Sequence, residues 1–188
     1  ETPVDVTKHV KFGVEPTRKG LLQQLQAAIG AALDAQGATS FGDLCRATLL
    51  MPGQLDRQKG AMRFVPNNQE WNGWAICREA AEMLAQLAGH QVVVTLENDG
   101  NAHVVGEMCQ GAARGFQSAS EASVGTGIGG GHAWRTSNNG ILLLVGAHGI
   151  AAEFGHDKVH LPGVRSQLCN CGCPGCAETY GSTAGLEH

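Results

Sequence analysis

A cluster of cysteines near the carboxyl end constrains this chain more than any other feature of its sequence. Four of the seven cysteines lie within residues 169–176, while the other three are scattered singly through the earlier part of the chain. An odd number of cysteines with a local cluster favours a metal site in a reducing compartment over a disulfide framework. His156 lies upstream, and thiolates with one imidazole are the ligands that tetrahedral zinc prefers. Three thiolates and His156 would fill the coordination sphere, so the sequence predicts a structural zinc and not a hydrolytic one.

Other interpretations of these residues stay open at this point. The cysteines could be buried thiols or a redox pair, and His156 could be an ordinary core or surface histidine. An iron–sulfur cluster is disfavoured because the spacing lacks the runs typical of ferredoxins.

The composition excludes several classes of protein. Of the 188 residues, 43% are hydrophobic, which is enough for a packed core and excludes wholesale disorder. The net charge of -4 and the lack of a Lys/Arg stripe predict that the chain binds neither nucleic acid nor an anionic membrane. The longest aliphatic run, residues 141–145, is too short to span a bilayer. No charged-then-apolar segment is seen at the start, so we expect no secretory signal.

The hydrophobic pattern alternates between strands and helices. We expect strands over 4–14, 44–51, 91–96 and 141–145, and helices over 21–33, 75–87 and 101–113. Residues 54–73 are expected to be a loop, and the chain is expected to be irregular after Gly155. This alternation predicts an α/β fold with a mixed sheet. In such sheets ligands collect at the carboxyl ends of strands, which directs attention to Pro52-Gly53 and to Asn98 and Asp99.

Residues 97–99 have side chains suited to acid–base chemistry on a hydroxyl group. Asp99 could accept a proton from a substrate hydroxyl while Asn98 binds a neighbouring one. Alternatively, Asp99 or Asn101 caps the following helix. Further residues could line a sugar-binding pocket, or could be surface acids and core aromatic residues: Glu153, Glu178, Asn67, Trp71 and Trp74.

Residues 125–131 form a glycine-rich loop whose backbone N–H groups could bind phosphate oxygens. The loop matches G-x-G-x-x-G, but a turn at Gly140 follows where a dinucleotide fold needs a helix. A Walker A motif is excluded because no Lys-Ser or Lys-Thr pair follows the glycines. A flexible turn without a ligand is the alternative.

Taken in order, these segments resemble the ROK family of repressors, open reading frames and kinases. The resemblance spans most of residues 4–185. It rests on Pro52-Gly53-Gln54-Leu55-Asp56, on Pro66-Asn67 followed by Trp71, on Glu97-Asn98-Asp99-Gly100-Asn101-Ala102, on the run G-T-G-I-G-G-G at 125–131, on Glu153-Phe154-Gly155-His156, and on Cys169-x-Cys171-Gly172-x-x-Gly175-Cys176-x-Glu178. The last two in tandem are specific, because they match the E-x-G-H and zinc signatures of the family.

The resemblance implies a role for each motif. Asp99 would be the general base on a sugar hydroxyl. The residues that bind the sugar would be Gly53, Asn67, Asn98, Glu153, His156 and Glu178. The phosphates of ATP, bridged by Mg²⁺, would lie against Gly125, Thr126 and Gly127. The ligands of Zn²⁺ would be His156, Cys169, Cys171 and Cys176.

The implied fold is α/β, with the mixed-sheet lobes of actin-like (ribonuclease H-like) ATPases and a structural zinc site. We expect a partial N-terminal lobe over 1–97, a partial C-terminal lobe over 98–185, and the remnant of an affinity tag at 186–188. Both lobes would be incomplete, because the D-x-G-G-T hairpin and the late glycine motif of the family are not found. Cys173 departs from the family pattern and could compete for zinc or oxidise.

The implied function is ATP-dependent phosphorylation of a hexose or N-acetylhexosamine by a cytoplasmic, glucokinase-like enzyme. Its partner would be a small-molecule sugar, and a homodimer fits the family. Two alternatives are kept: the sugar-binding effector domain of a ROK-type transcriptional repressor, and an inactive zinc-binding fragment.

Overall fold

A computed structural model describes residues 17–35, 37, 40–65 and 68–186. The chain divides into two compact units: Glu1–Leu49 with Leu55–Leu96, and Leu50–Gln54 with Glu97–His188. The strand expected over 4–14 and the candidate sugar ligand Asn67 lie outside the described residues.

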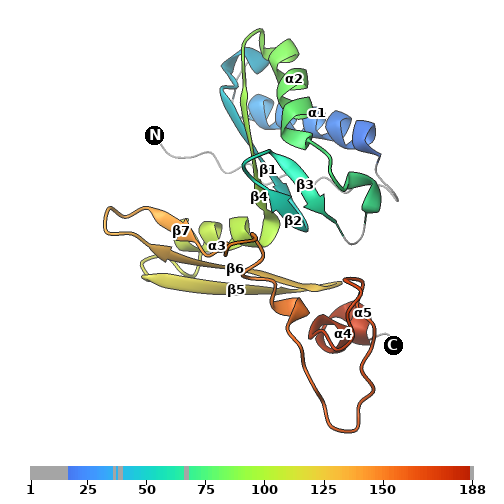
Figure 1. Ribbon diagram of the computed structural model, residues 1–188. Helices are drawn as coiled ribbons and strands as arrows, with labels where there is room; N and C mark the ends of the chain where they lie inside the picture. The colour runs from blue at the N-terminus through green and yellow to red at the C-terminus, as the bar shows by residue number, and fades with distance from the viewer. Residues whose placement is uncertain (1–16, 36, 38–39, 66–67, 187–188) are drawn as a thin grey trace. The chain divides into compact units, whose positions relative to one another are not determined.

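Two helices and a pair of strands account for most of the first unit. The helices are α1 (Arg18–Ala35) and α2 (Ile76–Ala88), and strand β1 (Arg46–Met51) pairs with β4 (Val93–Asn98) (Figure 1). In α2, the buried residues Ile76, Ala80 and Leu84 recur every four positions, as the helical period requires. Strands β1 and β4 begin in the first unit and end in the second, so the residues that follow them belong to the second unit.

The expectation of a loop over 54–73 is wrong. Strand β2 (Gln54–Asp56) pairs with β3 (Ala61–Phe64), and residues Gln69–Trp71 form a turn of 3-10 helix. Each strand is too short for an alternating pattern to be recognised in the sequence. Trp71 and Trp74 are only 6% and 1% exposed, with ring centroids 6.2 Å apart, so they are core residues.

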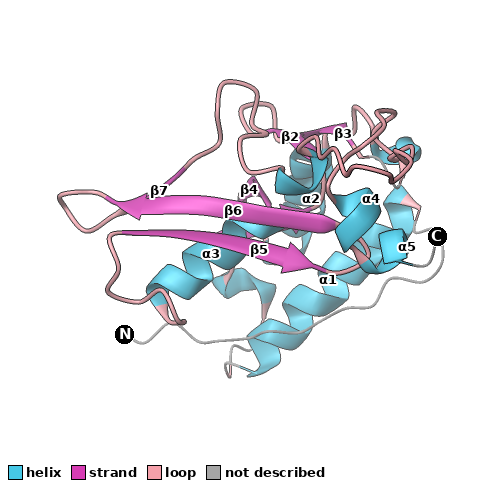
Figure 2. Ribbon diagram, turned by 90° about the horizontal axis from the view of Figure 1, so that it is seen from below, coloured by secondary structure: helices cyan, strands magenta, loops and turns pink. Residues whose placement is uncertain are grey.

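The second unit contains a three-stranded antiparallel sheet and a helix. The strands are β5 (Ser118–Val124), β6 (Ile128–Arg135) and β7 (Ile141–Leu143), in the order β5-β6-β7 (Figures 1 and 2). Helix α3 (Asp99–Cys109) packs on this sheet, where Val104, Met108 and Ala133 form a fully buried cluster. The helix begins two residues earlier and ends four residues earlier than the helix expected over 101–113.

The glycine-rich segment is a loop only in its first half. Residues 128–131 begin β6, and Gly129, Gly130 and Gly131 are paired with residues of β5. Glycine is needed here because the helix approaches the strand backbone closely: a Cβ atom on Gly131 would lie 2.5 Å from the carbonyl oxygen of Gly100. The first half of the segment is thus the expected turn, and the second half is a strand whose glycines allow α3 to pack closely.

The chain after Gly155 is largely irregular, as expected. A turn of 3-10 helix (Phe154–His156) is followed by a long connection with two isolated bridges, Lys158 to Cys176 and Leu168 to Pro174. Two one-turn helices, α4 (Glu178–Gly181) and α5 (Thr183–Leu186), were not expected. None of the helices formed by the described residues has the length and apolar character that a bilayer span requires.

Candidate functional site and metal centre

The junction of β4 and α3 brings polar side chains together. Asn98 caps α3, because its Oδ1 accepts a hydrogen bond from the backbone N–H of Asn101 at 3.2 Å. Its Nδ2 donates to the carbonyl oxygen of Gly53 at 3.4 Å, which ties the Pro-Gly turn to the same point. The capping residue is therefore Asn98, and not Asp99 or Asn101. The Asp99 carboxylate is exposed on the first helical turn.

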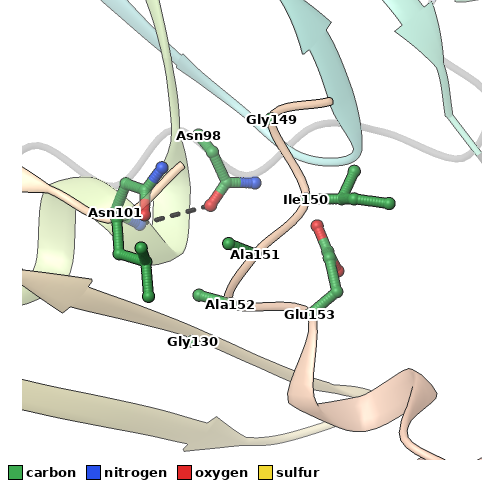
Figure 3. A pocket seen from close by; sticks show the side chains of 9 residues that line it. Asn98, Asn101, Gly130, Gly149, Ile150, Ala151, Ala152 and Glu153 are labelled. Atoms are coloured by element: carbon green, nitrogen blue, oxygen red, sulfur yellow. Dashed lines mark hydrogen bonds between the residues drawn. The ribbon is translucent and has the colours of Figure 1, made fainter. Parts of the chain in front are cut away.

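A small, open hollow lies beside this junction. Figure 3 shows Asn98 and Asn101 from the β4–α3 junction and Glu153 from the start of the E-x-G-H segment around it. Its remaining wall is formed by Gly130, Leu144 and residues 149–152. The hollow therefore combines an amide and a carboxylate, groups that bind hydroxyls, with a small apolar wall.

Burial and nearby charges change the pKa of the Glu153 carboxyl. Burial raises the pKa of its carboxyl above the ordinary value, His156 opposes this, and the carboxylates of Asp99 and Glu178 add to it. Among the other three, His156 and Glu178 are in direct contact, with His156 Nδ1 3.5 Å from Glu178 Oε1. The placement of Asp99, Glu153, His156 and Glu178 in one sugar site stays a prediction.

The expected metal ligands also converge. One ligand atom each from His156, Cys169, Cys171 and Cys176 lies within 4.8 Å of all the others. The backbone of Gly172 and Gly175 is left-handed, with φ of 86° and 74°, which lets residues 169–176 fold back on themselves. Cys173 is exposed and lies outside the group of four.

The spacing of these atoms fits a tetrahedral ion. The Cys171 and Cys176 Sγ atoms are 3.6 Å apart, and Cys169 Sγ is 3.6 Å from His156 Nδ1. Zinc–sulfur bonds of about 2.3 Å in a tetrahedron would separate two sulfurs by about 3.8 Å. These residues could therefore hold zinc with little rearrangement.

The thiols differ in acidity. Burial and a hydrogen bond to Glu178, offset only in part by the Cys171 N–H, raise the pKa of Cys169 well above its ordinary value. Burial also opposes ionisation of Cys171, but hydrogen bonds from the Cys173 backbone and from neighbouring thiols lower its pKa. A bound dication deprotonates its thiol ligands, so metal binding here would release protons and tighten with rising pH.

Lys158 is a neighbour of the metal cluster that the sequence analysis missed. Its Nζ donates a hydrogen bond to Cys176 Sγ at 2.8 Å, and this bond raises the pKa of the ammonium group. An ammonium group at this sulfur offsets part of the negative charge of three thiolates. No regular spacing relates Lys158 to the cysteines, so only the bridge between residues 158 and 176 reveals the contact.

Glu178 connects the metal cluster with the glycine-rich turn. Its Oε1 lies 2.8 Å from Cys169 Sγ and 3.5 Å from His156 Nδ1. Its Oε2 accepts a hydrogen bond from the Ile128 N–H at 3.4 Å. Residues 125–127, the part of the segment that stays a turn, lie directly before Ile128. The candidate phosphate residues Gly125, Thr126 and Gly127 are therefore next to a candidate sugar residue.

Two relatives match 93% and 73% of the chain. A glucokinase from Thermotoga maritima is 35% identical over 174 residues, 93% of this chain, and a xylose repressor from Bacillus subtilis is 31% identical over 138 residues, 73% of this chain. The crystal structure of a ROK family glucokinase from Streptomyces griseus, in complex with glucose and AMPPNP, matches 92% of this chain with 31% identity and a TM-score of 0.68. This chain spans 49%, 32% and 48% of those three proteins, respectively.

The fold and its mixed sheets define an α/β protein of the actin-like ATPase class, matching ROK sugar kinase structures as expected from the sequence. The model of the ROK family matches residues 5–188. The chain belongs to the ROK family, which confirms the resemblance drawn from its motifs.

Proposed function

We propose that this chain carries the sugar site and the phosphate-binding turn of an ATP-dependent sugar kinase. The substrate is a hexose or an N-acetylhexosamine. The observation that carries the proposal is the hollow lined by Asn98 and Glu153, together with Glu178, whose Oε2 accepts a hydrogen bond from the Ile128 N–H beside the glycine turn. The similarity to two glucokinases, one with glucose and AMPPNP bound, supports the same assignment.

In this proposal the sugar hydroxyls are bound by Gly53, Asn67, Asn98, Glu153, His156 and Glu178. Asp99 accepts the proton of the attacking hydroxyl while its oxygen bonds to the γ-phosphorus and ADP leaves. ATP with Mg²⁺ supplies the phosphoryl group, and its phosphates lie against Gly125, Thr126 and Gly127. His156, Cys169, Cys171 and Cys176 would hold Zn²⁺, which would fix the orientation of the imidazole and leave its other nitrogen free to bind a hydroxyl. The partial lobes at 1–97 and 98–185, the cytoplasmic location and the homodimer stay predictions.

A second candidate function is the effector domain of a transcriptional repressor. The similarity to a xylose repressor favours it specifically. An effector domain needs to bind a sugar but needs neither a general base nor a phosphate turn. The Asp99 carboxylate on the first turn of α3 and the turn at 125–127 therefore favour the kinase.

Replacing the proposed base tests the assignment. We expect Asp99→Asn in the full-length gene product to lower ATP-dependent phosphorylation by about 100-fold or more while sugar binding persists. The assay couples ADP release to a panel of hexoses and N-acetylhexosamines, and calorimetry measures sugar binding in parallel. Unchanged turnover in the variant excludes Asp99 as the base. Sugar binding without ATP turnover in the unmutated protein identifies the effector domain, and neither activity identifies an inactive zinc-binding fragment.

A further inference from the structure

The glycine turn is fastened to the segment that follows the last metal ligand. The carbonyl oxygen of Gly125 accepts two hydrogen bonds from Thr183, one from its backbone N–H at 2.8 Å and one from its hydroxyl at 2.6 Å. Thr183 begins α5 and lies seven residues after Cys176. A carbonyl with both lone pairs engaged by one residue is held in a defined direction.

The direction of this carbonyl decides where the next N–H points. The peptide bond between Gly125 and Thr126 is trans, and in a trans peptide the carbonyl and the following N–H point to opposite sides. Because Thr183 holds the Gly125 oxygen, the Thr126 N–H is directed away from α5. If this peptide rotated by half a turn, the partly negative carbonyl oxygen of Gly125 would take the place of the Thr126 N–H. An anion in that space is bound by the N–H and would be repelled by the carbonyl oxygen.

Glu178 holds the other end of the same turn. Its Oε2 accepts from the Ile128 N–H, and the space beside Gly127 is filled by that oxygen, which would lie 2.8 Å from a Cβ atom there. The Oε1 of this carboxylate contacts Cys169. Both attachments of the turn therefore come from residues next to, or just after, the candidate metal ligands.

We propose that Thr183 is a positioning residue for phosphoryl transfer, which holds the 125–127 turn so that the Thr126 N–H faces the nucleotide phosphates. The inference rests on the proposed function, because it takes nucleotide phosphates as the ligand of the turn. Through Thr183 the turn is tied to the segment that follows the candidate metal ligand Cys176.

The test compares Thr183→Val, which removes the hydroxyl at nearly constant shape, with Thr183→Ser, which keeps it. Hydrogen exchange of the 125–128 amides and calorimetric binding of a non-hydrolysable ATP analogue are measured in the full-length gene product. Loss of one hydrogen bond should weaken binding of the analogue by about three- to tenfold in the valine variant. Exchange at 125–128 should rise, the KM for ATP should increase more than kcat falls, and sugar affinity should stay within about twofold. The serine variant should behave like the unmutated protein.

Two results would overturn the role of Thr183. One is unchanged exchange at 125–128 in Thr183→Val, and the other is increased exchange over the whole second unit, which would indicate general destabilisation. Failure of the proposed function is recognised separately, because the unmutated protein would then bind no ATP analogue. In that case the exchange data would still show whether Thr183 holds the turn. The role of Thr183 in phosphoryl transfer would be refuted, because the proposed kinase function on which it rests would be refuted.

Discussion

Cys173 and Cys176 are three positions apart, yet the fold gives them different environments. Cys176 is fully buried among the converging ligand atoms, whereas Cys173 is exposed and outside the group. We expect Cys176→Ser to lose most of its bound zinc after dialysis, because serine replaces one of four ligands. Cys173→Ser, the matched control, should keep about one zinc per chain. Elemental analysis of both purified variants decides this, and equal zinc contents would remove Cys176 from the ligand set.

Glu153 should make stability depend on pH. Its pKa is raised in the folded protein, chiefly by burial, so the folded state binds a proton more tightly than the unfolded state. At pH values above the pKa of Glu153 in the folded protein, the buried ionised carboxyl therefore lowers the free energy of unfolding. This destabilisation disappears below the pKa of the unfolded state, which is about 4.3. We expect Glu153→Gln to raise the free energy of unfolding at pH 8 and to leave it almost unchanged near pH 3.5.

Denaturant titrations of both proteins at the two pH values measure this difference. Glu82→Gln is a suitable control, because Glu82 is exposed on α2. An equal effect of Glu153→Gln at both pH values would show that burial of the ionised carboxyl does not limit stability.

At the scale of single elements, the packing of α3 on β6 depends on glycine at particular positions. A methyl group on Gly131 would meet the Gly100 carbonyl and a Val104 methyl group, whereas one on Gly129 would meet nothing within 4 Å. We expect Gly131→Ala to destabilise the protein by about 1–3 kcal/mol and to lower its melting temperature by several degrees. Gly129→Ala, on the same strand, should be neutral or slightly stabilising, because alanine loses less backbone entropy on folding. Thermal unfolding followed by circular dichroism compares the two, and similar losses would contradict the close approach.

The elements that the sequence predicted well are those defined by their own local pattern. Helix α2 shows a clear four-residue repeat, and its observed bounds differ from the expected ones by a single residue. Strands β2 and β3 were missed because three or four residues are too few for a pattern. The second half of the glycine run was mistaken for loop because its pairing with β5 is a contact between segments.

The same distinction applies to the site. The motifs around Asn98, Glu153 and Cys169 are contiguous in sequence, so their residues could be named in advance, although their roles stay predictions. The cap assigned to Asp99 or Asn101 fell instead to Asn98. Lys158 and Thr183 carry no motif, and their contacts with Cys176 and Gly125 arise only when distant segments meet.

At the scale of the whole molecule, all four candidate metal ligands belong to the second unit. Residues 157–177 form no helix or strand, and apart from turns their described secondary structure is limited to two isolated bridges, although backbone hydrogen bonds such as that from the Val159 N–H to the Gly175 carbonyl oxygen join parts of the stretch. Several of its apolar side chains are exposed, Leu168 to 74%. A structural zinc would therefore contribute much of the order of this segment.

Removing the metal should therefore loosen one unit and spare the other. We expect a chelator to increase hydrogen exchange over residues 154–183, including the Thr183 amide that binds Gly125, while the amides of α2 in the first unit keep their protection. Mass spectrometry of peptides from treated and untreated protein measures both regions in one experiment. In Cys176→Ser, the chelator should have no further effect, because the variant has already lost its metal. Equal exchange with and without chelator in the unmutated protein would show that the cluster does not organise the segment, and an equal rise in α2 would show that the two units do not respond independently.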